Sequence, residues 1–489
     1  MHQTTPNHLR FRRCVPILAA ISLVLGAGAP SEGQSVVLSG GRTSALREPH
    51  LPGASPSDTS PSRFIVGSTH FCGGADADGR AYQDQTGWPG FCDRSVLSPV
   101  RGYVFQVAAG YWKAAFDARW ADVNAFDGYA RASTRATSSN PCNQDPYYMH
   151  SVFKGLLNMY RATGDTTYVE RAVRLADLMI AAAHHYDPAW AHPTDAAAFV
   201  AWVATQGQLL YWNADACAPA GVSGYRYQLN ELQGLRGISE LARVLKVAGD
   251  RRWSKYFHYA DQVISFYAML GDGNPHLDSG GDKRDHFIMN ALDLFAASGE
   301  TRFRDWATAV ADTQLSVVYK DLGDYVEIHE GTREYSTVIL DVDHANRDAE
   351  LMRYWREVAW PGTADYMRKA VNTLLFRIWE NDPRVRIGST PDYPTLFRNF
   401  TDGSNLCVSG TTPPYRFGSV VNGWIELSRY DRRVLHIMET LTMRLVDKSV
   451  IDRFPATGSS CASNRNINYV LLGAAIGEMA YVQKLYGRN

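Results

Sequence analysis

The chain has 489 residues, 45% of them hydrophobic and 20% charged, and its formal net charge at pH 7 is −1. This balance of 49 basic and 50 acidic side chains excludes a broadly basic nucleic-acid-binding protein. A chain of this length exceeds the usual size of one hydrophobic core unless the architecture is a barrel or a solenoid.

Residues 1–30 are predicted to form a signal peptide. Three arginines lie between positions 10 and 13, an apolar stretch runs from Val15 to Leu25, and small residues follow. The apolar stretch is shorter than the roughly 20 residues that a membrane helix needs, and no other run approaches that length. We therefore expect a secreted or periplasmic protein without a membrane partner.

Seven cysteines are present, and Cys14 lies in the predicted signal peptide. Because an even number of cysteines remains in an exported chain, we expect disulfides. Pairing in sequence order predicts Cys72–Cys92, Cys142–Cys217 and Cys407–Cys461. Structural zinc is the alternative, but no CxxC pair is present. The acidic run at 271–286 lacks the spacing of an EF-hand, so we expect no metal and no cofactor.

The predicted signal peptide is followed by three further regions. Residues 31–62 are rich in Ser, Gly and Pro and are predicted to be a disordered leader. Residues 63–97 show no helical period and are predicted to be an extended lead-in, and residues 98–489 to be the catalytic domain.

From about residue 98 onward, helices alternate with tight Gly-Asp or Gly-Glu turns, as in YRATGDTTYVERAVRLADLMI from 160 and FAASGETRFRDWATAVADTQ from 295. Glycine suits the positive φ of a helix C-cap, and Asp, Ser or Thr suits the next N-cap. Twelve helices are predicted at 98–117, 144–162, 166–185, 228–248, 251–269, 284–298, 302–319, 344–359, 363–379, 417–429, 431–448 and 465–486.

Short turns and long loops alternate between these helices. In an antiparallel array the six long loops (118–143, 186–227, 270–283, 320–343, 380–416 and 449–464) share one face, and such long loops are usually functional. Helices that follow short turns carry one charged stripe, as outer helices should. Helices that follow long loops are low in charge after their first turn and rich in Gly and Ala. This pattern predicts an all-α (α/α)6 toroid, with an (α/α)7 or incomplete toroid and an open solenoid as alternatives.

The inner helices begin on the loop face, so their first turns should surround one cavity. Helix N-termini that converge in this way favour anions. The substrate-binding residues predicted there and in the neighbouring loops are Tyr148, Tyr227, Glu231, Arg284, His329, His344, Asn346, Arg347 and Arg416. Asp343 is predicted to cap the helix that follows it.

One chemistry that suits this cavity is β-elimination on a uronate, which needs a neutraliser for the carboxylate and a base near the α proton. Asn230, His286, and the pair Arg333 and Tyr335 follow one another on successive elements of the predicted ring. This order resembles the alginate-lyase-like and glucuronan-lyase-like polysaccharide lyases with helical toroid folds. The resemblance implies an acidic polysaccharide partner.

The resemblance also implies a role for each of these four residues. Asn230 and Arg333 would neutralise the carboxylate, His286 would be a neutraliser or base, and Tyr335 would be the base and acid. His344 in place of His286, and Arg347 in place of Arg333, are alternatives.

A second interpretation is glycoside hydrolysis by two carboxylates on the same fold. The candidates on the loop face are Glu231, Asp278, Asp282, Asp285, Glu327, Glu330, Asp343 and Asp402. A third interpretation is a carbohydrate-binding toroid without catalysis.

Overall fold

The computed structural model describes residues 93–120, 126–127, 145–185, 210–211, 228–269, 281–330, 339–342, 344–358, 360, 362–380, 396–397, 401–402, 423–446 and 469–487. They all belong to the second of two compact units, Pro49–Asn489. The predicted signal peptide, the leader, most of the lead-in and all seven cysteines lie outside the described residues. The disulfide pairing therefore stays a prediction.

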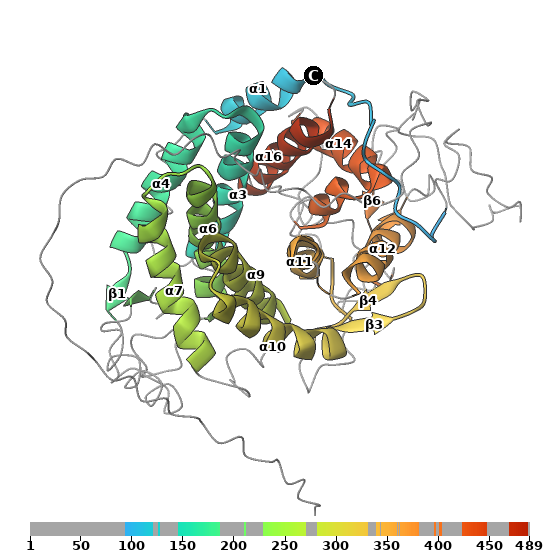
Figure 1. The fold of residues 1–489 in the computed structure, drawn as a ribbon. Helices are drawn as coiled ribbons and strands as arrows, with labels where there is room; N and C mark the ends of the chain where they lie inside the picture. Colours follow the sequence, from blue (N-terminus) through green and yellow to red (C-terminus); the bar gives the residue numbers. More distant parts are fainter. Residues whose placement is uncertain are drawn as a thin grey trace, which may run out of the picture. The chain divides into compact units, whose positions relative to one another are not determined.

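Six helices form a closed inner ring in this unit (Figure 1). Around the ring, each contacts the next, and the last contacts the first. In order they are α3 (Asp145–Thr163), α6 (Gln228–Val247), α9 (Gly281–Ser298), α11 (Asn346–Glu357), the 3₁₀ helix η4 (Trp424–Arg429) and α16 (Tyr469–Tyr486).

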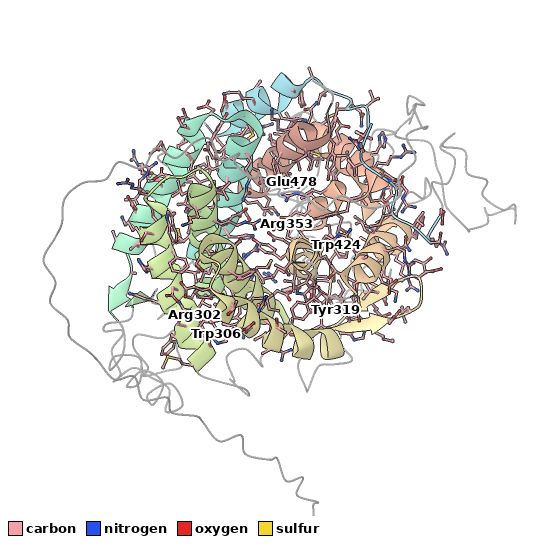
Figure 2. The ribbon with its side chains drawn as sticks, in the orientation of Figure 1. Arg302, Trp306, Tyr319, Arg353, Trp424 and Glu478 are labelled. Atoms are coloured by element: carbon pink, nitrogen blue, oxygen red, sulfur yellow. The ribbon has the colours of Figure 1, made fainter. Side chains whose placement is uncertain are left out.

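A second set of six helices packs around the first and completes the (α/α)6 toroid that the sequence predicts (Figure 1). These outer helices are α1 (Ala109–Arg119), α4 (Thr166–Ala181), α7 (Trp253–Met269), α10 (Thr301–Val318), α12 (Thr363–Thr373) and α14 (Arg432–Val446). Helix α12 continues into one π-helical segment, η3 (Leu374–Ile378). Figure 2 shows the same division in the side chains: Arg353 and Glu478 lie toward the centre, whereas Arg302 and Trp306 lie at the periphery.

In the part of the chain that the structure describes, three small antiparallel sheets accompany the helices. Strand β1 (His184–His185) pairs with β2 (Leu210–Tyr211), β3 (Tyr319–Asp321) with β4 (Val326–Ile328), and β5 (Trp379–Glu380) with β6 (Leu396–Phe397). In the β3–β4 hairpin, Tyr319 is opposite Ile328. This hairpin occupies part of the predicted long loop 320–343. It places Tyr319 next to the first turn of α11, where the Tyr319 hydroxyl contacts Asp348.

The short turns have the predicted geometry. Gly164, Gly249, Gly299 and Gly362 all have φ between 73° and 78°, the left-handed region that favours glycine. The carboxylate of Asp165 accepts a hydrogen bond from the Thr167 amide at 3.0 Å and so caps α4.

Glycines let α3 and α16 approach closely in the inner ring. A Cβ atom at Gly477 would lie 2.7 Å from the carbonyl oxygen of Gly155, and one at Gly155 would lie 3.0 Å from that of Gly473. The predicted abundance of glycine in the inner helices therefore has a steric reason here.

The first and tenth predicted helices differ from the structure. Residues 98–108 are not helical, and α1 begins only at Ala109. Instead, α14 and the residue before it hold this segment: the Ser98 amide donates to Asp431 Oδ2 at 2.8 Å, and the Gln106 amide to Glu439 Oε1 at 2.8 Å. Pro99 and Gly102, whose φ is 84°, oppose a helix at this position. Of the predicted helix 417–429, residues 424–429 form the 3₁₀ helix η4.

Within the described part of the chain, no helix combines the length and the apolar character needed to cross a membrane.

Candidate functional site at the loop-side end of the ring

Four buried polar side chains from four inner helices meet near the helix starts. We call His150, Gln233, His286 and Arg347 the loop-side cluster. The first three are each the sixth residue of their helix, in α3, α6 and α9. Gln233 Nε2 lies 3.2 Å from His150 Nδ1, Gln233 Oε1 lies 2.9 Å from His286 Nε2, and Arg347 Nη2 donates to the same oxygen at 3.4 Å. Equivalent turns of inner helices therefore lie at the same height, as expected for helices that run in one direction.

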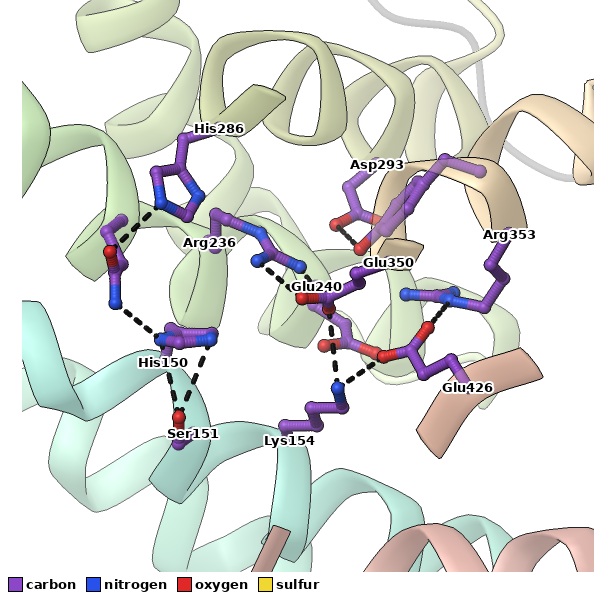
Figure 3. Close-up of polar contacts among 12 residues, drawn as sticks. His150, Ser151, Lys154, Arg236, Glu240, His286, Asp293, Glu350, Arg353 and Glu426 are labelled. Carbon is purple, nitrogen blue, oxygen red and sulfur yellow. Dashed lines mark hydrogen bonds and ion pairs between the residues drawn. The ribbon is translucent and has the colours of Figure 1, made fainter. Parts of the chain in front are cut away.

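Deeper along the helices, charged side chains form a network of ion pairs, and Figure 3 shows part of it, including Lys154, Glu350 and Glu426. This axial charge network has six cations and six carboxylates, and each of the six inner helices contributes. Its members are Lys154, Arg161, Arg236, Arg243, Arg353 and Arg429, with Glu240, Asp293, Glu350, Glu357, Glu426 and Glu478. The expectation that inner helices are low in charge beyond their first turn is therefore wrong.

The ion pairs of this network connect one helix to another. Lys154 Nζ lies 2.5 Å from Glu426 Oε1, Arg236 Nη1 donates to Glu350 Oε2 at 2.9 Å, and Arg353 bridges Glu357 and Glu426. Because most of these side chains are at most 6% exposed, the ring is filled at its middle.

The pKa values in the network diverge. Burial opposes ionisation of Glu240, but the charges of Arg161 and Arg353 outweigh it and lower the pKa to about 2. For Asp293, burial outweighs Arg243, with Glu240 adding to the burial, so its pKa is raised to about 6. Arg243 pairs with both Asp293 and Glu357, so its positive charge is shared between two carboxylates.

Two buried aspartates flank the loop-side cluster in sequence. Asp285 precedes His286 on α9, and Asp348 follows Arg347 on α11. The hydroxyl of Tyr319 donates to Asp348 Oδ1 at 2.9 Å. Burial raises the pKa of Tyr319 well above its usual value, and the charges of Asp348 and then Asp285 raise it further. Asp348 therefore contacts this hydroxyl directly, and Asp285 acts on it through its charge.

Glu231 at the start of α6 and Glu327 in β4 have close partners as well. The hydroxyl of Tyr267 donates to Glu231 Oε2 at 2.6 Å. Glu327 Oε1 lies 2.7 Å from His329 Nε2 and 3.1 Å from Lys320 Nζ. Burial opposes ionisation of Glu327, but the hydrogen bonds from His329 and Lys320 lower its pKa.

The structure brings some of the predicted site residues together. Glu231, Arg284, His286, Asn346 and Arg347 are all buried at the starts of α6, α9 and α11. Gln233 links His286 to Arg347.

His329 and His344 have different settings. His329 is buried against Glu327. His344 is exposed, and its Nδ1 lies 2.8 Å from Asp341 Oδ2.

Several predicted residues lie outside what the structure describes. They are Tyr227, Arg333, Tyr335 and Arg416, with the carboxylates Asp278 and Asp343. Tyr148, Asn230 and Asp282 lie in α3, α6 and α9, but their side chains are not among the described ones. Their roles stay predictions.

Sequence reasoning missed Gln233, Asp348 and the axial charge network. Gln233 lies three residues after Asn230, on the same face of α6, so helical spacing alone could have indicated it. Asp348 lies in the first turn of α11. Acidic residues are common there because they interact favourably with the helix N-terminus, so its position did not indicate a site residue.

A groove of about 570 Å³ lies elsewhere, at the short-turn ends of α3 and α16. Its lining includes Tyr103, Lys113, Gln483 and Lys484 but no carboxylate and no histidine. Among the described residues, no three His, Cys, Asp or Glu side chains are grouped as a metal site requires. The chemistry-bearing side chains gather at the loop-side end instead.

No protein-family model matches the chain, and no curated protein matches it by sequence. Solved structures that match include an inactive variant of an α-1,6-mannanase of glycoside hydrolase family 76 from Salegentibacter sp. HEL1_6, in complex with mannotetrose. It is 10% identical, covers 77% of this chain and 100% of its own, and has a TM-score of 0.43. A family 76 mannosidase from Bacteroides thetaiotaomicron is 12% identical, covers 76% of this chain and 100% of its own, and has a TM-score of 0.44.

The lyase interpretation is corrected by these findings. The matching structures are described as glycoside hydrolases that act on mannan, not as lyases and not as enzymes of uronates. β-Elimination as the reaction and its uronate substrate are therefore withdrawn, whereas Asn230, His286, Arg333 and Tyr335 stay predicted residues of the site.

The mannanase was inactivated by replacing two consecutive aspartates. The present sequence has no two consecutive aspartates.

Proposed function

We propose that the chain is a glycoside hydrolase that binds a polysaccharide at the loop-side end of the ring. The observation that carries this proposal is the pair of buried carboxylates, Asp285 and Asp348, at the starts of α9 and α11. Most glycoside hydrolases use two carboxyl groups, one to protonate the leaving oxygen and one as base or nucleophile.

The surroundings of this pair suit a carbohydrate. Arg347, Gln233 and His150 supply hydrogen-bonding groups at the same end of the ring, and sugar hydroxyl groups both donate and accept hydrogen bonds. We therefore place catalysis at this end of the ring.

The proposal is tested by measuring new reducing ends from a panel of neutral and acidic polysaccharides, α-1,6-mannan among them. We expect activity in the wild type and a loss of at least about 100-fold in Asp285→Asn and in Asp348→Asn, because positioned acid–base groups contribute about 10²–10⁴-fold.

Asp305→Asn is the matched control, since Asp305 lies exposed on outer helix α10 and pairs with Arg304. Thermal unfolding of all three variants checks that they fold. Full activity in both Asp285→Asn and Asp348→Asn would remove this pair from the mechanism.

We also infer that the protein is exported. Support comes from the basic, then apolar, then small-residue order of residues 1–30. Sequencing of the mature N-terminus after expression in a secreting host checks this. A protein that retains Met1 in the cytoplasmic fraction would contradict it.

A further inference from the structure

Gln233 occupies a bridging position between two histidines and an arginine. Its amide nitrogen lies 3.2 Å from His150 Nδ1, and its amide oxygen lies 2.9 Å from His286 Nε2 and 3.4 Å from Arg347 Nη2. All four side chains are at most 6% exposed. Each contact must therefore be satisfied within the protein, because an unmatched buried donor or acceptor costs about 1–3 kcal/mol.

Arg347 determines which way the amide of Gln233 points. A guanidinium group has donors only, and an amide has one acceptor oxygen and one donor nitrogen. The atom of Gln233 that faces Arg347 must then be Oε1. The opposite orientation would place the NH₂ group against the guanidinium, donor against donor.

This orientation fixes the position of the proton on both imidazole rings. Because Oε1 accepts, His286 Nε2 must carry a hydrogen atom. Because the Gln233 nitrogen donates, His150 Nδ1 must be an acceptor, so the proton of neutral His150 is on Nε2. The hydroxyl of Ser151 lies 3.5 Å from both ring nitrogens of His150 and does not distinguish them.

The charges around His286 agree with a neutral ring. Burial lowers the pKa of His286 well below its usual value, and the charges of Arg236, Arg347 and His150 lower it further. His150 lies on α3, Arg236 on α6 and Arg347 on α11. The charges that act on His286 therefore come from the three other helices of the loop-side cluster. Its second nitrogen, Nδ1, has no hydrogen-bond partner among the described residues.

We propose that Gln233 is a positioning residue that holds His150 and His286 as neutral Nε2–H tautomers at the end of the ring where the proposed function places catalysis. Only the effect on activity rests on the proposed function. Adding a proton to Nδ1 of His150 would require the Gln233 amide to turn away from Arg347.

The proton positions are measured by long-range ¹H–¹⁵N spectra of the full chain labelled with ¹⁵N-histidine, with His150→Gln and His286→Gln variants for assignment. We expect both rings of the wild type to be protonated at Nε2 only, near neutral pH. A His150 ring protonated at Nδ1 would overturn the proposal without any variant of Gln233.

Two substitutions separate positioning from packing. In Gln233→Glu, both side-chain oxygens accept, so His150 should acquire a proton at Nδ1 and its pKa should rise by about one unit or more. Gln483→Leu is the matched control, because Gln483 is another glutamine at most 9% exposed, whose Nε2 donates to the Val107 carbonyl. The control should leave both tautomers unchanged. An unchanged His150 tautomer in Gln233→Glu would also overturn the proposal.

An activity measurement completes the test. We expect kcat/KM on the best polysaccharide of the panel to fall at least tenfold in Gln233→Glu and its pH profile to shift, with neither effect in Gln483→Leu. If the wild type shows the expected tautomers but cleaves no glycoside, the proposed function fails and the assignment of the protons stands. If glycosides are cleaved but the tautomers differ, this inference fails alone.

Discussion

Asp293 illustrates how one residue responds to the buried charges around it. Its Oδ1 accepts from Arg243 at 3.1 Å and its Oδ2 from the Tyr354 hydroxyl at 2.9 Å. Even so, burial raises its pKa to about 6. An aspartate in an unfolded chain titrates near 4, so the folded protein binds this proton more tightly. The stabilisation is complete below about pH 4 and is lost as the pH rises through about 6.

Asp293→Asn removes this dependence. The unfolding free energy of the wild type, relative to that of the variant, should fall by on the order of 2 kcal/mol between pH 4 and pH 7. Urea unfolding followed at four pH values in that interval measures the difference. A constant difference across the interval would show that Asp293 does not titrate there.

At the residue scale, the sequence allowed prediction of part of the site. Glu231, Arg284, Asn346 and Arg347 were expected at the starts of inner helices, and they lie there. Hydrogen-bond partners such as Gln233 come from other helices, and helical spacing indicates only which residues share a face. A single sequence therefore cannot determine which faces meet.

Among the elements, short turns were predicted most accurately because their signal is local. A glycine at positive φ followed by a capping side chain fixes both helix ends, as at Gly164 and Asp165. Residues 98–108 were predicted wrongly because they are held by Asp431 and Glu439, which lie more than 330 residues further along the chain. Such tertiary contacts override local helical preference.

The close contact between α3 and α16 gives a test at this scale. Gly477→Ala should lower the unfolding free energy by about 1–3 kcal/mol, because the new methyl group would lie 2.7 Å from the Gly155 carbonyl oxygen. Gly110→Ala in α1 is the control, since a Cβ there meets nothing within 4 Å. The control should raise stability by about 0.5–1 kcal/mol. Equal melting temperatures for the two variants would refute this account of the glycines.

For the whole molecule, the axial charge network connects all six inner helices. A buried charge that loses its partner costs about 3–5 kcal/mol. Arg236→Met should show a loss of this size, because Glu350 would lose its two hydrogen bonds to Arg236 and, among the described residues, keep the ion pair with Lys154 at 3.7 Å and the charge of Arg353.

Arg304→Met is the surface control. The Arg304–Asp305 pair on α10 is exposed, so its loss should change stability by less than about 1 kcal/mol. Chemical denaturation measures both variants. Similar losses for Arg236→Met and Arg304→Met would show that the network is not a continuous support of the ring.

The fold of the whole molecule was predicted from the sequence and the reaction was not. Alternation of short turns and long loops is a global pattern, and it predicted the two rings (Figure 1). Choosing between elimination and hydrolysis needs the positions of a few atoms. His286 and Asp285 are neighbours at the start of α9, and their order along the chain does not distinguish the two reactions.

The most direct test of the central claim is the mass of the products from a polysaccharide or oligosaccharide that the wild type cleaves. Hydrolysis adds one molecule of water per cleavage and leaves a saturated sugar at both new ends, and we predict this result, with loss of the products in Asp285→Asn and Asp348→Asn. Products whose masses sum to that of the substrate, with an ultraviolet-absorbing unsaturated end, would contradict the account.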